Sequence, residues 1–282
     1  GKAFEFKVIN NTEPGWTFTI KAGTKMKYGY GIYNPVESGI LLERGESHTF
    51  TIRQTLNIGD PVRIYSAVNL EGVDLSNILP RLSNIELNNV WNESLGTSLK
   101  ELILGNGSSV NQILTSISSI AKAKSLEKLD IRGCLNITSM DLTSNIRLTS
   151  LIATNCGLTS VELPSSAPLV ELRLPTTLQT IKLKQLTKLT PSGVTLNLTN
   201  LRSLTITGCK SLSTDLSFIL GYFIDGNVSP SQKSLYMDNI LWENVTPEVF
   251  LKICDAKDNG MDVTLKGKVI LTDSSQSIVD RI

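Results

Sequence analysis

The chain has 282 residues, of which 40% are hydrophobic and 19% are charged, and its formal net charge at neutral pH is +1. This composition is typical of a folded chain and excludes an intrinsically disordered one. The balanced charge argues against nucleic acid as the main partner, because phosphate binding needs a concentrated excess of basic side chains. No apolar run reaches the roughly 18 to 20 residues that span a bilayer, so we expect no membrane span in this segment.

Residues 1–57 show the alternation of apolar and polar residues that is typical of β-strands. The alternating apolar residues are Phe4/Phe6/Val8, Trp16/Phe18/Ile20, Met26/Tyr28/Tyr30/Ile32 and Phe50/Ile52. Turn-forming sequences such as Glu13-Pro14-Gly15 and Asn34-Pro35 separate them. We therefore predict a small antiparallel β domain over residues 1–57, which also caps the N-terminal end of the remaining chain.

A leucine pattern, Leu-x-x-Leu-x-Leu, recurs from Leu82 onward and dominates the rest of the chain. Successive copies begin 22 residues apart (Leu126 to Leu148) and 21 residues apart (Leu148 to Leu169), which lies within the range of leucine-rich repeats. The copies are Leu82/Ile85/Leu87, Leu99/Leu102/Leu104, Leu126/Leu129/Ile131, Leu148/Leu151/Ala153, Leu169/Leu172/Leu174 and Leu201/Leu204/Ile206. A second series falls half a repeat later, at Ile137/Met140/Leu142, Leu158/Val161/Leu163 and Leu178/Ile181/Leu183.

Stacked coils of this kind would bury a continuous column of leucines that a single coil cannot bury alone. The fold class predicted from the sequence is therefore mixed α/β and mostly β. It consists of a leucine-rich-repeat solenoid with short coils over residues 58–272, preceded by the small antiparallel β domain.

Three insertions interrupt the repeat, and each is predicted to be helical. Residues 109–121 place Ile113, Ile117 and Ile120 on one apolar face after a serine cap. Residues 214–224 form the second insertion, and residues 246–254, with Thr246 as cap and Pro247 at the first position, form the third. Residues 273–282 resemble the first turns of a further helix, and we expect them to begin a segment that continues beyond this piece.

The positions between the leucines are predicted to face solvent and to offer a surface to a partner. Their side chains are mixed in charge, so electrostatics alone does not name a ligand. The residues predicted to contribute to binding on this stripe are Lys128, Asp130, Ile152 and Arg173.

Four aromatic residues in the N-terminal segment form a second candidate site. Trp16, Tyr28, Tyr30 and Tyr33 could stack on sugar rings if they shared an exposed β face. Aromatic residues also fill the cores of small β domains, and we favour that interpretation, with Tyr33 as the residue most exposed to a ligand.

Catalytic and metal chemistry finds little support in the sequence. Cys134, Cys156 and Cys209 each stand at the ninth position of a repeat, where a small polar side chain turns inward to bond the backbone. Cys254 is interpreted as a small core residue. A single histidine, His48, leaves almost no room for a Ser-His-Asp triad or a two-histidine metal site. We expect no cofactor, no metal and no catalytic residue.

A two-carboxylate glycosidase is the enzymatic alternative, since that chemistry needs only a pair of acids. Its candidate acids are Glu86, Glu93, Asp130 and Glu171, which are scattered over the predicted repeat surfaces.

One stretch of the repeat resembles a particular group of proteins. It runs from Leu148-Thr149-Ser150-Leu151 through Cys156-Gly157-Leu158-Thr159-Ser160-Val161-Glu162-Leu163-Pro164. It is similar to the Leu-Thr-Ser-Leu repeats of surface proteins from gut anaerobes and of tail-associated proteins from their phages. The resemblance covers roughly residues 60–272 and is specific for fold rather than function. The short β modules that often lead into such repeats carry a Trp-Gly-Asp-Gly turn, which this chain lacks.

The resemblance implies a non-enzymatic protein at an extracellular surface or in a virion. We therefore expect a structural or protein-interaction module of a larger surface or phage-tail assembly, whose partners are other protein subunits or a host receptor. The alternatives are a bacterial adhesin or glycan-binding protein and, behind these, the two-carboxylate glycosidase.

Overall fold

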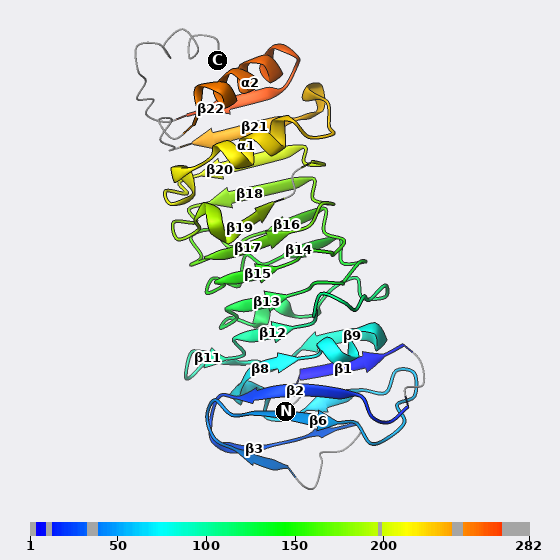
Figure 1. The fold of residues 1–282 in the computed structure, drawn as a ribbon. Coiled ribbons are helices and arrows are strands. Elements are labelled where there is room, and N and C mark those ends of the chain that lie inside the picture. Colours follow the sequence, from blue (N-terminus) through cyan, green and yellow to red (C-terminus); the bar gives the residue numbers. More distant parts are fainter. Residues whose placement is uncertain (1–3, 10–12, 33–38, 197–198, 239–244, 267–282) are drawn as a thin grey trace.

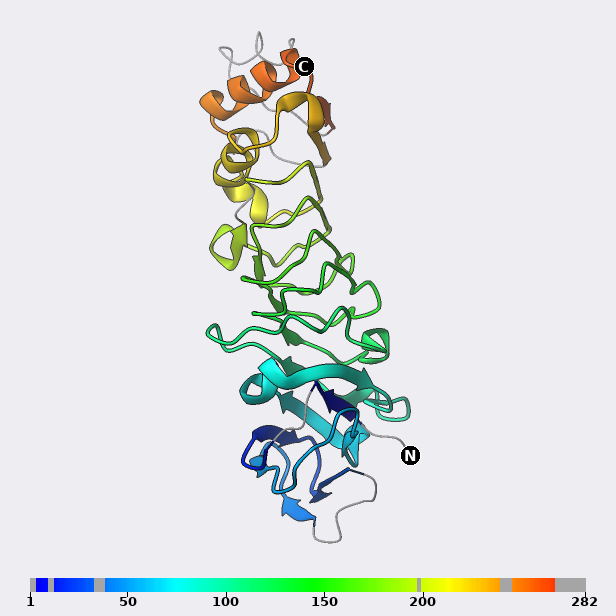
Figure 2. The same ribbon diagram turned by 90° about the vertical axis from the view of Figure 1, so that its right-hand side faces the viewer.

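Strand pairing runs along almost the whole chain and sets its elongated outline (Figure 1). The computed structural model describes residues 4–9, 13–32, 39–196, 199–238 and 245–266. The strands stack from the N-terminal end to the C-terminal end of the molecule. Two α-helices lie together near the C-terminal end (Figure 2).

The largest sheet is mixed and has eight strands in the order β19-β17-β15-β13-β12-β8-β2-β6. Strand β2 (Thr17–Ala22) pairs antiparallel with both of its neighbours, and the strands from β8 to β19 pair in parallel. The other seven strands are β6 (Ser47–Thr51), β8 (Leu70–Asp74), β12 (Glu101–Ile103), β13 (Lys128–Asp130), β15 (Ser150–Ile152), β17 (Glu171–Leu174) and β19 (Val194–Leu196).

A second, wholly parallel sheet has six strands in chain order. They are β14 (Ser139–Asp141), β16 (Ser160–Glu162), β18 (Thr180–Lys184), β20 (Ser203–Thr207), β21 (Ser234–Asp238) and β22 (Asp262–Leu265). From β13 to β20 the chain supplies strands to the two sheets in turn.

Three smaller sheets complete the strand pairing at the N-terminal end. A four-stranded sheet joins β4 (Tyr30–Gly31), β7 (Val62–Ile64), β1 (Phe4–Val8) and β9 (Leu82–Leu87). The pairs β3 (Met26–Tyr28) with β5 (Ile40–Leu42) and β10 (Trp91–Asn92) with β11 (Thr97–Ser98) form the two others.

The fold class predicted from the sequence is wrong. In place of a leucine-rich-repeat solenoid preceded by a small antiparallel β domain, the chain forms a mostly β structure of several sheets. The eight-stranded mixed sheet and the six-stranded parallel sheet are the largest of these. The physical reason lies in β2, which bonds to β8 through register pairs such as Ile20 with Val73. The N-terminal strands β2 and β6 thereby belong to the same sheet as the strands that carry the leucine triplets.

The predicted leucine series also divides differently from the expected order. Leu82, Ile85 and Leu87 lie in or at the end of β9, which pairs antiparallel with β1 rather than with the later triplets. The Leu201 triplet lies at β20 in the six-stranded sheet and continues the second series. The Leu201 triplet falls in the other sheet because β19, which carries no predicted triplet, already supplies the next strand of the eight-stranded sheet.

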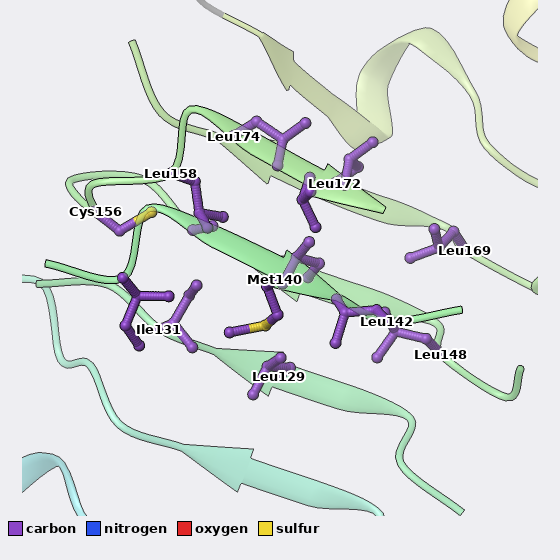
Figure 3. Packing of buried hydrophobic residues seen from close by; sticks show 14 of the residues in the cluster. Leu129, Ile131, Met140, Leu142, Leu148, Cys156, Leu158, Leu169, Leu172 and Leu174 are labelled. Atoms are coloured by element: carbon purple, nitrogen blue, oxygen red, sulfur yellow. The ribbon is translucent and has the colours of Figure 1, made fainter. Parts of the chain in front are cut away.

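Inward side chains from both large sheets form one hydrophobic cluster. Leu129 and Leu172 of the mixed sheet and Met140 of the parallel sheet point into the space between the strand layers (Figure 3). Leu102, Leu129, Leu151 and Leu172 occupy matching register positions on successive strands and are all fully buried. Burying a leucine side chain contributes about 2 kcal/mol to the free energy of folding. Each strand that adds a buried leucine therefore stabilises the fold by a similar amount.

The first predicted helix, at residues 109–121, is wrong. The segment is an irregular loop that ends in a short 3₁₀ turn, Ile120–Lys122. The side chain of Asn111 donates to the carbonyls of Leu79 and Leu82 and accepts from the amides of Ile113 and Leu114. A buried asparagine that satisfies four backbone groups competes with helical hydrogen bonding, which explains the loop.

The other two insertions contain helices, α1 (Ser217–Ile224) and α2 (Pro247–Asp258). The hydroxyl of Thr246 caps α2 by accepting from the amide of Val249, as the sequence predicts. No helix within the described ranges is long and apolar enough to cross a membrane. Residues 273–282, predicted to begin another segment, lie outside the described residues.

Lys233 closes the C-terminal end of α1 from within the protein. Its ammonium group donates to the carbonyls of Phe223 (2.7 Å) and Ile224 (3.0 Å) and lies 5.3 Å from the centre of the Phe223 ring. Only 4% of the residue is exposed, and this burial lowers the pKa of the amine. The last carbonyls of a helix attract a cation, and this attraction offsets part of the free-energy cost of burying the ammonium group.

Three cysteines predicted to point inward, Cys134, Cys156 and Cys209, are buried, as is Cys254. The Cys209 thiol lies 3.4 Å from the carbonyl oxygen of Leu183, in keeping with a backbone contact at this position. Burial raises the pKa of Cys134 to about 12 and that of Cys156 to about 11, from an ordinary value of 9.0. These thiols are therefore neutral at physiological pH and poorly suited to nucleophilic chemistry.

Close stacking of neighbouring turns predicts a sharp contrast between two Gly→Ala substitutions. A Cβ at Gly157 would meet the carbonyl oxygen of Leu135, whereas a Cβ at Gly221 in α1 would meet no atom within 4 Å. We expect Gly157→Ala to lower the free energy of unfolding by about 2 kcal/mol or more, since backbone must move. Gly221→Ala should be neutral or stabilising by up to about 1 kcal/mol. Urea denaturation of both variants checks this, and equal stabilities would contradict the tight stacking at Gly157.

The buried thiols predict a loss of stability at high pH. Their folded pKa values exceed the ordinary value of 9.0, so their contribution to the free energy of unfolding is complete below pH 9. Above pH 9 the thiols ionise in the unfolded chain but not in the folded one. The free energy of unfolding then falls by about 1.4 kcal/mol per thiol and pH unit. A Cys134→Ala/Cys156→Ala double variant should show a shallower decline between pH 9 and 11 in denaturation experiments. Parallel curves for the two proteins would show that these thiols ionise normally in the folded state.

Candidate functional site

The outward side chains of the eight-stranded mixed sheet form a continuous surface, here called the outer face. Because the leucines of successive strands point inward, the residues on either side of them point outward. The outer face comprises Ser47, Thr49, Thr19, Lys21, Gly72, Asp74, Glu101, Ile103, Lys128, Asp130, Ser150, Ile152, Glu171, Arg173 and Thr195.

All four residues predicted on the leucine stripe belong to the outer face. Asp130, Ile152 and Arg173 stand in register on neighbouring strands and form one row. Lys128 stands in the adjacent row, in register with Ser150 and Glu171. The structure thus brings these side chains together.

Ion pairs and hydrogen bonds hold many of these side chains in place. Arg132 donates from Nη2 to Asp130 Oδ2 at 2.7 Å, and this contact raises the pKa of the Arg132 guanidinium. Asp130 is only 2% exposed, so its carboxylate serves Arg132 rather than a free ligand. The surface here is charged but internally neutralised.

A second network spans the next three strands. Ser150 Oγ donates to Glu171 Oε1 at 2.7 Å, and Arg173 Nη1 donates to Thr195 Oγ1 at 2.8 Å. Arg173 also lies 3.7 Å from Glu171. These contacts fix side chains that would otherwise sample many rotamers.

A shallow hollow of about 150 Å³ opens in the outer face at Gly72. Gly72 leaves a gap between the side chains of Lys21 and Glu101, whose Cβ atoms would lie 3.3 Å and 3.6 Å from a Cβ placed there. Asp74 and Ile103 also contribute to the wall of this hollow.

A larger hollow of about 290 Å³ lies beside the first, where strands β8 and β12 begin. Four separate segments build it: the turn after β2, the turn before β6, the start of β8 and the β10–β11 hairpin. Its lining includes Gly23, Thr24, Arg44, Asn69, Glu71, Leu95, Thr97, Ser98 and Lys100. Glu71 bridges the two hollows, because its carboxylate lies 3.9 Å from Lys21 and 3.7 Å from Lys100.

Sequence reasoning missed both hollows. In the sequence Lys21 and Arg44 are ordinary charged residues and Gly23 an ordinary glycine, and no motif connects the three. No local pattern marks residues that meet from four distant segments, so this site becomes visible only in three dimensions.

The predicted aromatic site is divided between the core and the surface. Tyr28 is fully buried, and its hydroxyl lies within hydrogen-bond distance of the carbonyl oxygens of Thr24 and Asn69. Tyr30 is half-buried, donates to the carbonyl of Thr51 and packs edge-on against Phe18. Trp16 is half-buried beneath the Arg81 guanidinium, 5.5 Å from the ring centre. Tyr33 lies outside the described residues.

The residues considered for catalysis or metal binding are dispersed. None of Glu86, Glu93, Asp130 and Glu171 lines either hollow. His48 is half-buried on β6, with its ring 4.7 Å from that of Phe50. Across the described ranges, no group of three or more His, Cys, Asp or Glu side chains is placed to hold a metal ion.

Comparisons with known proteins leave this surface to be interpreted on its own geometry. No family model, no curated protein and no solved structure matches the chain.

Proposed function

We propose that this chain is a non-enzymatic structural or protein-interaction module, and that the outer face of the eight-stranded sheet is its binding surface. One observation carries the proposal: the outward side chains stand in register across the sheet and are held by one another. The pairs Arg132–Asp130, Ser150–Glu171 and Arg173–Thr195 all lie on or beside this face.

A surface fixed in this way favours the binding of a protein. Each long side chain that becomes ordered on binding costs about 0.5–1.5 kcal/mol. Glu171 and Arg173 already have partners within the sheet, so less of this cost remains when a partner docks.

The dimensions of the outer face also suit an extended contact. Eight strands about 4.8 Å apart span on the order of 34 Å. Beside the strands, the turns that lead into β15 and β17 expose Ile146 and Val170, which are 62% and 50% accessible. Apolar side chains beside a polar, pre-ordered face resemble the mixed composition of protein–protein interfaces.

The charges of the outer face favour short-range recognition. Lys21, Glu101, Lys128 and Glu171 alternate in sign along one row. Long-range steering needs an excess of one sign, so we expect a binding rate with little dependence on salt.

The proposed setting is a larger bacterial-surface or phage-tail assembly, in which the partner is another protein subunit or a host receptor. Support for this setting comes from the resemblance of the segment beginning at Leu148 to proteins of those assemblies. A bacterial adhesin is the alternative within the same surface setting.

Site-specific photocrosslinking in the native assembly tests the proposed surface. A benzophenone amino acid at Ile152 on the outer face should crosslink one defined neighbouring protein, and excess unlabelled chain should compete with it. The same probe at Thr180, an exposed position on the six-stranded sheet, is the matched control and should give little of this product.

A charge reversal sharpens the same experiment. Arg173→Glu would remove the bond to Thr195 and place a second carboxylate beside that of Glu171. We expect the Ile152 crosslink to fall at least about tenfold, as for a contact worth about 1.4 kcal/mol or more. Crosslinking that is equal at Ile152 and Thr180, or that Arg173→Glu leaves unchanged, would refute the assignment of the outer face.

A further inference from the structure

We infer that the larger hollow beside the outer face is a binding site for an acidic sugar residue, a pyranose that carries a carboxylate. This inference stands apart from the protein-binding role of the outer face. None of the residues that line this hollow belongs to the predicted aromatic site at Trp16, Tyr28 and Tyr30, although Tyr28 supports its floor.

The polar groups that surround this hollow include several without a partner in the described part of the chain. Arg44, Asn69 and Thr97 line the hollow, and none of their side chains makes a hydrogen bond or ion pair within the described residues. Elsewhere on this face, arginines such as Arg132 and Arg173 are bonded. Polar side chains that are free to bind and line one hollow are a feature of ligand sites.

Arg44 is free although two acids flank it in the same turn. Glu43 pairs with Lys25 at 2.6 Å, and Glu46 accepts from the amide of Glu43 at 2.8 Å. Both carboxylates are therefore engaged, which leaves the guanidinium able to bind a carboxylate from outside through two parallel hydrogen bonds.

The remaining charges of the hollow also favour a single anionic group. Its lining holds two cations, Arg44 and Lys100, and one carboxylate, Glu71. Because Glu71 lies near both Lys21 and Lys100, its repulsion of an incoming carboxylate is reduced.

The other lining groups match a sugar ring better than a simple anion. Asn69 and Thr97 can donate to and accept from ring hydroxyls, and Leu95 offers an apolar surface to the C–H face of the ring. The volume of about 290 Å³ lies at the small end of ligand pockets and suits one ring.

The floor of the hollow is rigid. The buried Tyr28 hydroxyl lies 2.7 Å from the carbonyl oxygen of Thr24 and 2.9 Å from that of Asn69, so its one proton is shared between the two. The Gly23 amide donates to the same Asn69 carbonyl at 2.8 Å. Two segments of the lining are thus held together before any ligand arrives, which lowers the entropic cost of binding.

Calorimetric titration of the intact chain with three probes tests the inference. Glucuronate should bind with a Kd on the order of 1 mM, as expected for a ligand of this size. Glucose, which lacks the carboxylate, and acetate, which lacks the ring, should each bind at least about tenfold more weakly. Equal binding of acetate would reduce the hollow to a simple anion site, and equal binding of glucose would remove the role of the charge; either result overturns the inference.

Three variants connect the titration to this hollow. Arg44→Gln should weaken glucuronate binding at least about tenfold, since it removes charge-assisted hydrogen bonds, and Thr97→Val should weaken it less. Arg53→Gln is the matched control, because Arg53 is also exposed but lines neither hollow. Both arginines lie on the surface, and unchanged circular dichroism would show that the variants fold. Undetectable glucuronate binding at about 20-fold the expected Kd, or equal binding by Arg44→Gln and Arg53→Gln, contradicts the site.

Discussion

In-register pairing of strands is the constraint on which the rest of the structure depends. Leu102, Leu129, Leu151 and Leu172 occupy matching positions on four neighbouring parallel strands, and all four are fully buried. A slip of one residue would turn each leucine toward solvent and each polar neighbour toward the core. The burial of these leucines therefore fixes the register of the sheet, and the register fixes which side chains meet on the outer face.

The outer face is a consequence of that register. Ser150 can donate to Glu171, and Arg173 to Thr195, because in each case the two residues stand opposite one another on paired strands. The smaller hollow arises where the row passes through Gly72, and the larger one arises where turns and a hairpin rise beside the strand ends. The two proposed binding functions thus rest on one backbone arrangement but use different side chains.

Much of the strand arrangement could be predicted from the sequence, since local periodicity records which side chains are buried. The triplets at Leu126, Leu148 and Leu169 lie on or beside successive strands of the mixed sheet, and the half-repeat triplets at Ile137, Leu158 and Leu178 on the parallel one. Three features escaped prediction because they depend on contacts between distant residues. Strand β2 joins the mixed sheet through β8, Asn111 replaces a helix by bonding backbone groups on both sides, and the larger hollow draws its lining from four segments.

Hydrogen–deuterium exchange of the intact chain tests most directly whether the N-terminal strands and the leucine strands form one sheet. The bonds between β2 and β8, such as those around Ile20 and Val73, should protect both strands together. Amides of β2, β8 and β12 should then share one opening free energy and lose protection at the same denaturant concentration. Independent opening of residues 4–52, while β8 and β12 stay protected, would contradict a continuous eight-stranded sheet.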